Sequence, residues 1–447
     1  MYIPPPASER APKVRKHLSA DALHGIVRSA FEEIEDHRGA RATIPLPDAL
    51  MSGFAMFSLK DPSLLAFEDR RQDENMKNIY MIGTVPSDTS MREILDPVEP
   101  GAVRPAFCTV FRQLQRGKGL EAFVFYKNNY LLALDGTGYY SSQSIHCDSC
   151  MQKVSRTTGE ITYYHQMLGA VILHPDRRQV IPFAPEPIQK QDGTTKNDCE
   201  RNAAKRLLKY IREEHPRLNF IVVEDGLASN APHIRELTAL NMHYILGVKP
   251  GDHAFLYEHV ETAYDRDGMT FISWREGDDW CEIGFLNGVP LNESNQDLTV
   301  NYLEYSEYDV QGNLIKRFSW ITDLKINKQN AALFVRGGRG RWKIENETFN
   351  TLKNQGYHFE HNFGHGNHNL SVVFAMLMML AFLVDQVQEI ACPLFRAVLE
   401  KVGSKRLLWE RIRSHYWHFV FKSMRQLHEV ILYDRAKEMR FPGFDTS

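Results

Sequence analysis

The sequence has 447 residues, of which 43% are hydrophobic and 24% are charged. This length suggests several domains, since one domain commonly takes roughly 100–200 residues, and the composition excludes a disordered or collagen-like chain. The net charge of −3 excludes a uniformly basic chain, and six cysteines are too few for a disulfide scaffold. Positive charge is instead local: residues 325–355 hold seven Lys/Arg against two Asp/Glu, and residues 396–447 hold eleven against six.

The chain contains one long apolar run. It extends from Leu370 to Val384 and covers 15 residues, whereas a membrane-spanning helix needs roughly 20. We therefore expect a buried core helix there and no membrane association. The start of the sequence, MYIPPPASERAPK, lacks the apolar core of a secretory signal. Both features favour a soluble protein of the cytoplasm.

Residues 1–120 are predicted to form a helical N-terminal domain. Apolar residues recur with a helical period from Val14 to His37, and residues that can cap helices precede several later apolar stretches. Further helices are expected around residues 49–57, 63–72, 90–95 and 106–116.

Short apolar strands follow. Asn129–Asp135 is predicted to be a strand that ends in an acid, Gly136 and Gly138 permit a turn, and Tyr139–Ile145 can be the return strand. Ile161–Leu173 is predicted to be a third strand. The three strands can form an antiparallel meander.

Helices and strands then alternate along the chain. The expected order is a helix at Asp198–Glu214, a strand at Asn219–Val223, a helix at Ala231–Leu240 and a strand at His243–Val248. Such alternation favours parallel pairing of the strands. Together with the preceding meander, it is the plan of an RNase H-like core without its last helix.

An insertion delays that last helix. Residues 252–323 are polar and β-rich, with strands expected over 269–274, 280–286, 298–306 and 314–322. Gly337 and Gly338 predict a break before a helix that begins near Arg341. The predicted fold class is therefore α/β, with an RNase H-like core at residues 121–251 and 324–390. A β-rich insertion occupies 252–323, and a helical C-terminal region occupies 391–447.

Three acids occupy places that converge in such a sheet. Asp135 ends the first strand, Asp225 follows the fourth strand, and Glu345 lies early in the helix after the insertion. Carboxylates brought together in this way can bind Mg²⁺ or Mn²⁺, which prefer oxygen ligands. Two such ions can activate a water or a hydroxyl and stabilise the leaving oxygen of a phosphodiester. Taken singly, each Asp is also a common turn residue, and Glu345 can pair with Arg341 on a solvated helix face.

The sequence around Glu345 adds two further side chains. Arg341 precedes it by four residues, shares its helical face and could hold a phosphate. Trp342 could stack on an unpaired base, or could simply pack in the core.

The chain resembles the bacterial insertion-sequence DDE transposases of the cut-and-paste type, which carry a β-rich insertion before the catalytic glutamate. Their signature places tyrosine, arginine, glutamate and lysine at fixed spacing, and Arg341 and Glu345 match it. Gly338 stands at the tyrosine position and Leu352 at the lysine position, with Lys353 one residue later. The resemblance covers roughly residues 45–390. It extends to the strings LDGT at 134–137, VEDGL at 223–227 and GYHFEHNFGHG at 356–366.

The resemblance implies a function. Asp135, Asp225 and Glu345 would form the metal-binding triad that cuts the ends of a mobile element and joins them to new DNA. The partners would be double-stranded DNA, both terminal inverted repeats and target, and the active complex would be a homodimer or larger, acting on the nucleoid. The N-terminal domain would bind DNA, as would Arg341, Trp342, Lys353 and, by analogy, Trp320. The alternative for Trp320 is a buried strand residue.

Two other functions fit the same residues. One is a different RNase H-like DNA nuclease that cuts without strand transfer. The other is an inactive relic of a transposase that only binds DNA. Retention of all three acids argues against the relic, whereas the departures at Gly338 and Leu352 leave it open.

A second candidate metal site lies in the meander. Cys147 and Cys150 form a CxxC pair, and a structural zinc site usually needs four ligands. His165 is a candidate further ligand, with His146 and His174 as alternatives. Four more histidines occur close together, at 358, 361, 365 and 368. A metal site is one interpretation of them, and contacts with DNA phosphate or structural hydrogen bonds fit them at least as well.

Overall fold

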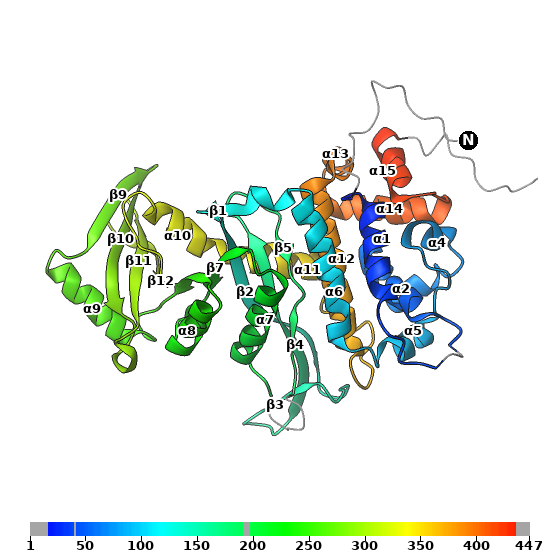
Figure 1. Cartoon of the computed structure of the whole chain (residues 1–447), viewed down its shortest axis with the longest axis horizontal. Coiled ribbons are helices and arrows are strands. Elements are labelled where there is room, and N and C mark those ends of the chain that lie inside the picture. The colour runs from blue at the N-terminus through cyan, green and yellow to red at the C-terminus, as the bar shows by residue number, and fades with distance from the viewer. Residues whose placement is uncertain (1–16, 40–41, 191–196, 435–447) are drawn as a thin grey trace, which may run out of the picture.

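The computed structural model of the chain describes residues 17–39, 42–190 and 197–434. The fold is mixed α/β, with one 12-stranded sheet and many helices. Figure 1 shows an elongated molecule, with the strands of the insertion at one end and the N- and C-terminal helices at the other.

The N-terminal part is helical, as the sequence predicts. Side-chain oxygens of Ser19, Ser63, Asp73 and Ser87 accept hydrogen bonds from backbone N–H groups at the starts of four helices. Residues 1–16, including the predicted start of the first helix at Val14, lie outside the described residues. The helices are α1 (Ala20–Glu32), α2 (Leu46–Leu59), α3 (Leu64–Glu68), α4 (Glu74–Tyr80), α5 (Asp88–Leu95) and α6 (Pro100–Arg116).

The first half of the sheet surrounds one long strand. A short 3₁₀ helix, η2 (Gly119–Phe123), leads into its strands and helices. These are β1 (Val124–Tyr126), β2 (Asn129–Ser142), β3 (Met151–Val154), β4 (Ile161–Leu173), β5 (Ile181–Pro182), β6 (Glu186–Ile188), α7 (Glu200–Glu214), β7 (Asn219–Glu224), α8 (Ala231–Ala239) and β8 (His243–Gly247). β2 pairs antiparallel with β4 and parallel with β7, and β7 pairs parallel with β8. β5 and β6 lie antiparallel to β4.

The predicted turn at Gly136 and Gly138 is wrong. β2 continues through both glycines to Ser142, because β4 pairs with it residue by residue, including Gly136 with Leu168 and Gly138 with Gln166. The ladder shifts register just after Gly138, so the glycines accommodate an irregularity within the strand rather than a reversal. Asp135 therefore lies within β2 and does not end it.

The insertion extends the same sheet. It contains the four predicted strands, β9 (Thr270–Glu276), β10 (Asp279–Pro290), β11 (Thr299–Tyr308) and β12 (Leu314–Thr322), and also a helix that we did not predict, α9 (Ala254–Asp265). β12 pairs antiparallel with β8, so the strand order is β3-β4-β2-β7-β8-β12-β11-β10-β9. The insertion is thus joined to the rest of the sheet by backbone hydrogen bonds.

The helix after the insertion begins earlier than predicted. α10 spans Ala331–Gly340 and includes the glycines expected to break the chain. A side chain at Gly338 would collide with the indole of Trp320, and one at Gly337 would press on Phe125. The glycines therefore allow the helix to lie close to the sheet. A π-helical turn, η5 (Ile344–Phe349), and α11 (Asn350–Asn354) follow.

The long apolar run forms the central helix of the molecule. α12 (Leu370–Ala391) is long and apolar enough to span a membrane, but 94% of its apolar window is buried inside the structure. It packs against α2 and α6, between the sheet and the N-terminal helices (Figure 1). The core-helix prediction is therefore confirmed. The C-terminal helices are α13 (Pro393–Val402), α14 (Lys405–His418) and α15 (Met424–Tyr433).

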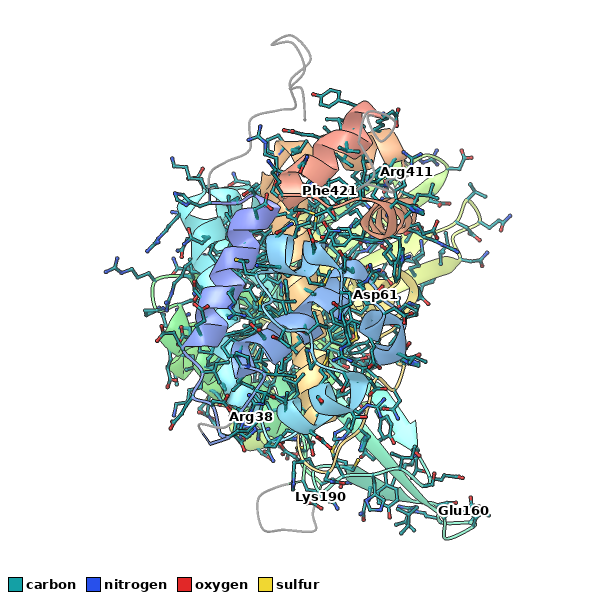
Figure 2. All side chains as sticks on the ribbon, turned by 90° about the vertical axis from the view of Figure 1, so that its right-hand side faces the viewer. Arg38, Asp61, Glu160, Lys190, Arg411 and Phe421 are labelled. Atoms are coloured by element: carbon teal, nitrogen blue, oxygen red, sulfur yellow. The ribbon has the colours of Figure 1, made fainter. Side chains whose placement is uncertain are left out.

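The hairpin of β3 and β4 projects from the body of the molecule. Figure 2 shows Glu160 at its tip, with Lys190 closer to the body. The base of this hairpin carries one of the two sites described below.

Candidate functional site

Asp135 in β2 and Asp225, which directly follows β7, lie at the same edge of the sheet. The parallel ladder between β2 and β7 ends where Ala133 pairs with Val223, so each Asp follows two residues beyond this last pair. Adjacent strands are about 4.8 Å apart, which places the two backbones side by side.

Local hydrogen bonds orient the two carboxylates. Asp135 Oδ1 accepts from the backbone N–H of Gly136 at 3.0 Å. Asp225 Oδ1 accepts from the N–H of Leu227 at 3.0 Å and caps a short 3₁₀ helix, η3 (Gly226–Ala228). At Asp225 the Asp-Gly pair therefore forms a turn that the Asp side chain stabilises by a hydrogen bond to the backbone two residues later.

Glu345 approaches the face of the sheet to which Asp135 points. Gly169 lies directly opposite Asp135 in the ladder between β2 and β4, and residues paired in this way share a face. Phe349 of η5 packs on Gly169, so the π-helical turn that carries Glu345 covers this face. π-Helical turns are uncommon and occur often at functional sites.

The pKa of Asp135 is affected by the charged residues around it. Burial raises the pKa of Asp135, and the negative charges of Asp225 and Glu345 raise it further. Arg341 opposes the shift, because its Nη1 lies 3.0 Å from Asp135 Oδ2. Asp225 and Glu345 therefore both lie within electrostatic reach of Asp135.

Glu200 is a fourth acid at this site, and we did not predict it. It is the first residue of α7, on the face of the sheet to which Gly136 points, and a side chain at Gly136 would collide with its carboxylate. Desolvation raises the pKa of Glu200, as do the negative charges of Asp135 and Asp225. The sequence signal was weak, since an acid in the first turn of a helix is common for helix-dipole reasons alone.

A cleft of about 770 Å³ lies over three of these acids, and Glu345 is not among the residues that line it. Asp135, Glu200 and Asp225 line it together with Lys205 and His233. His233 Nε2 lies 2.6 Å from Glu224 Oε2. Although burial opposes the charged form of His233, this Glu224 carboxylate gives it a raised pKa. The cleft is therefore lined both by acids and by the basic side chains of Lys205 and His233.

The predicted DNA-contacting residues are placed differently from one another. Trp342 is 49% exposed, and the Arg341 guanidinium lies 5.0 Å from its ring centroid. Lys353 Nζ pairs with Glu360 at 2.8 Å. Trp320 is only 6% exposed and packs against Gly338 and Phe318. In this conformation Trp320 is therefore the buried strand residue of the two alternatives and is not available for base stacking.

The second site gathers sulfur and nitrogen ligands. Cys147, Cys150, His165 and His365 each offer one ligand atom, and all four atoms lie within 4.8 Å of one another. All four residues are buried. This Cys2His2 cluster could hold a metal ion such as zinc.

Three of these four ligands were predicted from the sequence. His365 was not, because it is 215 residues away from Cys150 along the chain. The group of four histidines at 358–368 was the available signal. His146 stacks on Tyr163 with ring centroids 4.3 Å apart, and His174 contacts Asp176. Neither histidine belongs to the cluster.

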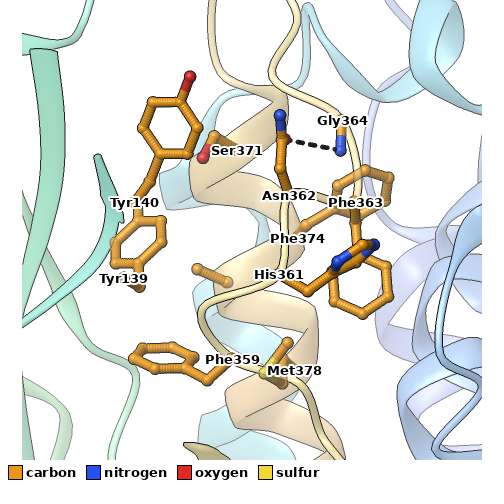
Figure 3. Close-up of a pocket in the computed structure, with 11 residues that line it drawn as sticks. Tyr139, Tyr140, Phe359, His361, Asn362, Phe363, Gly364, Ser371, Phe374 and Met378 are labelled. Atoms are coloured by element: carbon orange, nitrogen blue, oxygen red, sulfur yellow. Dashed lines mark hydrogen bonds between the residues drawn. The ribbon is translucent and has the colours of Figure 1, made fainter. Parts of the chain in front are cut away.

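A small cavity adjoins the cluster. It lies between β2 and the segment that leads into α12, and its volume of about 20 Å³ suits roughly one water. Figure 3 shows Tyr139 and Tyr140 on one side and the loop around Asn362 and Gly364 on the other, where Asn362 Oδ1 accepts from the Gly364 N–H at 3.1 Å. The cavity is too small for a substrate.

Comparison with known proteins leaves the family open. No protein-family model matches this sequence, and no curated protein matches it.

Proposed function

We propose that the protein is a DNA transposase of the DDE type, which cuts phosphodiester bonds at the ends of a mobile element and transfers the strands to target DNA. The observation that supports this most is the gathering of Asp135, Asp225 and Glu345 at one edge of the mixed sheet. Acids without a structural role seldom gather in this way, because their mutual repulsion is costly.

The strand arrangement supports an RNase H-like core. β2, β4 and the edge pieces β5 and β6 are antiparallel neighbours, and β7 and β8 continue the sheet in parallel to β2. Helices α7 and α8 follow in the order expected of that core. The segment carrying Glu345 comes after the inserted strands, as in the transposases that this chain resembles.

The acids fit a divalent cation. Carboxylate oxygens suit Mg²⁺ or Mn²⁺, and a cation would offset the burial and the like-charge repulsion that together raise the pKa of Asp135. In this proposal Asp135, Asp225 and Glu345 hold the metal. Metal ions would supply activation of the attacking hydroxyl and stabilisation of the leaving oxygen.

The surroundings fit a nucleic acid. Arg341 and the exposed Trp342 lie beside the acids, where a guanidinium can hold a phosphate and an indole can stack on an unpaired base. The proposed partners are element ends and target DNA. We also propose a homodimer or larger complex, because two ends must be joined, and a location in the cytoplasm on the nucleoid.

The test uses the full chain and a supercoiled plasmid that carries the DNA bordering its gene. Cutting is measured with Mg²⁺, Mn²⁺ or EDTA for the wild type, Asp225→Asn and Glu121→Gln. Glu121 is an exposed acid away from the cleft, paired only with Lys118 at 3.7 Å among the described residues. We expect metal-dependent cutting that falls by about 100-fold or more in Asp225→Asn, since even outer-shell changes at metal sites cost about 10–100-fold.

The control and the other outcomes separate the alternatives. Glu121→Gln should cut like the wild type, and circular dichroism should show that both variants are folded. Undiminished cutting by Asp225→Asn would overturn the proposed site. Binding of the ends without cutting favours the relic, and cutting without joining favours another RNase H-like nuclease.

A further inference from the structure

The Cys2His2 cluster combines ligands from three separate segments. Cys147 and Cys150 come from the turn between β2 and β3, His165 from β4, and His365 from the segment between α11 and α12. Their exposed fractions are 6%, 0%, 1% and 6%, in that order. Two thiols and two imidazoles that point to one common centre and are shielded from solvent are the ligand set of a structural zinc site.

The distances fit a tetrahedral ion. The two sulfurs are 3.8 Å apart, His165 Nε2 lies 3.3 and 3.4 Å from them, and His365 Nε2 lies 3.2 Å from Cys150 Sγ. Zinc bonds of about 2.3 Å to sulfur and 2.0 Å to nitrogen would separate two sulfurs by roughly 3.8 Å, and a sulfur from a nitrogen by roughly 3.5 Å. The backbone N–H of Cys147 also points to Cys150 Sγ, at 3.5 Å, as expected of a ligand supported from outside the metal shell.

We propose that Cys147, Cys150, His165 and His365 hold a structural Zn²⁺ ion that fastens the β3–β4 hairpin to the segment leading into α12. Two thiolates and two imidazoles favour zinc over hard cations such as Mg²⁺ or Ca²⁺. Four protein ligands and burial leave no open position for a substrate, so the site is closed and structural rather than catalytic.

The segment that the zinc would hold in place has little regular structure of its own. Residues 355–369 run irregularly between α11 and α12, with positive φ at Gly356, His358, Gly364 and Gly366. The Asp96 carboxylate holds the far end of this segment, where it accepts the N–H groups of four successive residues, 367–370. His365 lies just before that anchor, so a metal there fixes the remaining part.

The metal cluster also contacts β2, the strand that carries Asp135. His365 stacks on Tyr140 with ring centroids 4.2 Å apart, and Tyr140 pairs with His165 in the ladder between β2 and β4. Tyr140 is five residues from Asp135 on β2. Zinc would therefore hold together β2, β4 and the chain that follows Glu345.

Metal analysis of the purified full chain tests the proposal without any DNA. We expect about one zinc ion per chain in the wild type, and a loss to near zero in Cys150→Ser and His365→Ala. His146→Ala is the matched control, because this exposed histidine adjoins Cys147 but lies outside the cluster. It should keep its zinc.

A second measurement covers the case in which the ligand variants fail to fold. Wild-type protein is stripped with a chelator and titrated with Co²⁺, which reports thiolate ligands and tetrahedral geometry through its visible absorption. We expect one equivalent of Co²⁺ to bind with that spectrum, to be displaced by Zn²⁺ and to raise the Tm. A folded wild-type chain that contains no zinc and binds neither Zn²⁺ nor Co²⁺ would overturn the proposal. Because neither measurement involves DNA cleavage, they stand or fall separately from the proposed function.

Discussion

Two tryptophans show how differently the same residue type is used near the acids. Trp342 is half exposed beside Arg341, whereas Trp320 is buried between Gly338 and Phe318. Under the proposed function, a stacking role in DNA binding would therefore belong to Trp342, whereas Trp320 has a packing role.

Alanine variants of the two tryptophans should separate these roles. Trp342→Ala should weaken binding of DNA with unpaired ends by about 1–3 kcal/mol, the value of one base–aromatic stack, and leave the Tm nearly unchanged. Trp320→Ala should cost about 3–5 kcal/mol of folding stability through the cavity it leaves. Fluorescence anisotropy and thermal unfolding measure the two effects. Equal loss of stability in both variants would contradict the assignment.

The residues of the two candidate sites were only partly predictable from the sequence. Asp135, Asp225 and Glu345 could be chosen because the order of elements implied a common sheet edge, and Cys147 and Cys150 because their spacing is local. Glu200 and His365 could not, since each reaches its site through tertiary packing. Glu200 reaches its site because Gly136 has no side chain that would collide with it. His365 reaches its site because the irregular segment between α11 and α12 runs past the two cysteines.

At the scale of elements, α10 depends on glycines that would normally weaken a helix. A side chain at Gly337 would collide with Phe125, and a side chain at Gly338 would collide with Trp320. The helix therefore lies closer to the sheet than ordinary side chains permit, and it carries the chain directly into Arg341 and η5.

This close packing predicts opposite effects for two glycine substitutions within helices. Gly338→Ala should destabilise the protein by about 1–3 kcal/mol, because the added methyl group must displace Trp320. Gly25→Ala in α1 should stabilise it by about 0.5–1 kcal/mol, because open space surrounds that position and alanine favours the helix. Urea unfolding measures both. Stabilisation by Gly338→Ala would show that the contact with Trp320 is unimportant.

Element types were predicted better than their ends. The four strands of the insertion follow their apolar alternation, and α12 follows its apolar run. Two wrong predictions, the turn within β2 and a start of the helix near Arg341 that is later than the true start of α10, have one cause. Glycine predicts a turn or a break in a sequence, but here close packing requires it at Gly136, next to Glu200, and at Gly338, next to Trp320. α9 was missed because its few buried positions, such as Leu256 and Val260, lie in a polar stretch interpreted as β-rich.

At the scale of the whole molecule, the N- and C-terminal helices pack together around buried histidines. α1 packs against α15, and burial lowers the pKa of His24 in α1 and of His428 in α15 to about 4. Both side chains are almost fully buried. This junction, like the continuity of the sheet from β8 into β12, depends on contacts that no local sequence pattern specifies.

The lowered pKa values predict acid sensitivity of that junction. The unfolded chain takes up a proton on each histidine near pH 6.5, but the folded protein does so only near pH 4, so stability falls as the pH drops through this window. Each histidine should account for roughly 3 kcal/mol, at about 1.4 kcal/mol per pKa unit. The His428→Leu variant should flatten the curve of Tm against pH, whereas His418→Gln, at an exposed site, should not. A wild-type Tm that is constant from pH 7 to pH 4.5 would contradict this prediction.

The joining of element ends to a second DNA molecule tests the central claim most directly. Wild-type protein and Glu345→Gln are incubated with Mg²⁺, a plasmid carrying the DNA that borders the gene, and a separate target plasmid, and the junctions are sequenced. We predict junctions at fixed end sequences, flanked by short direct duplications of the target, with the wild type and none with Glu345→Gln. Equal numbers of such junctions with Glu345→Gln, or cut ends that the wild type never joins, would contradict the assignment of this protein as a DDE transposase.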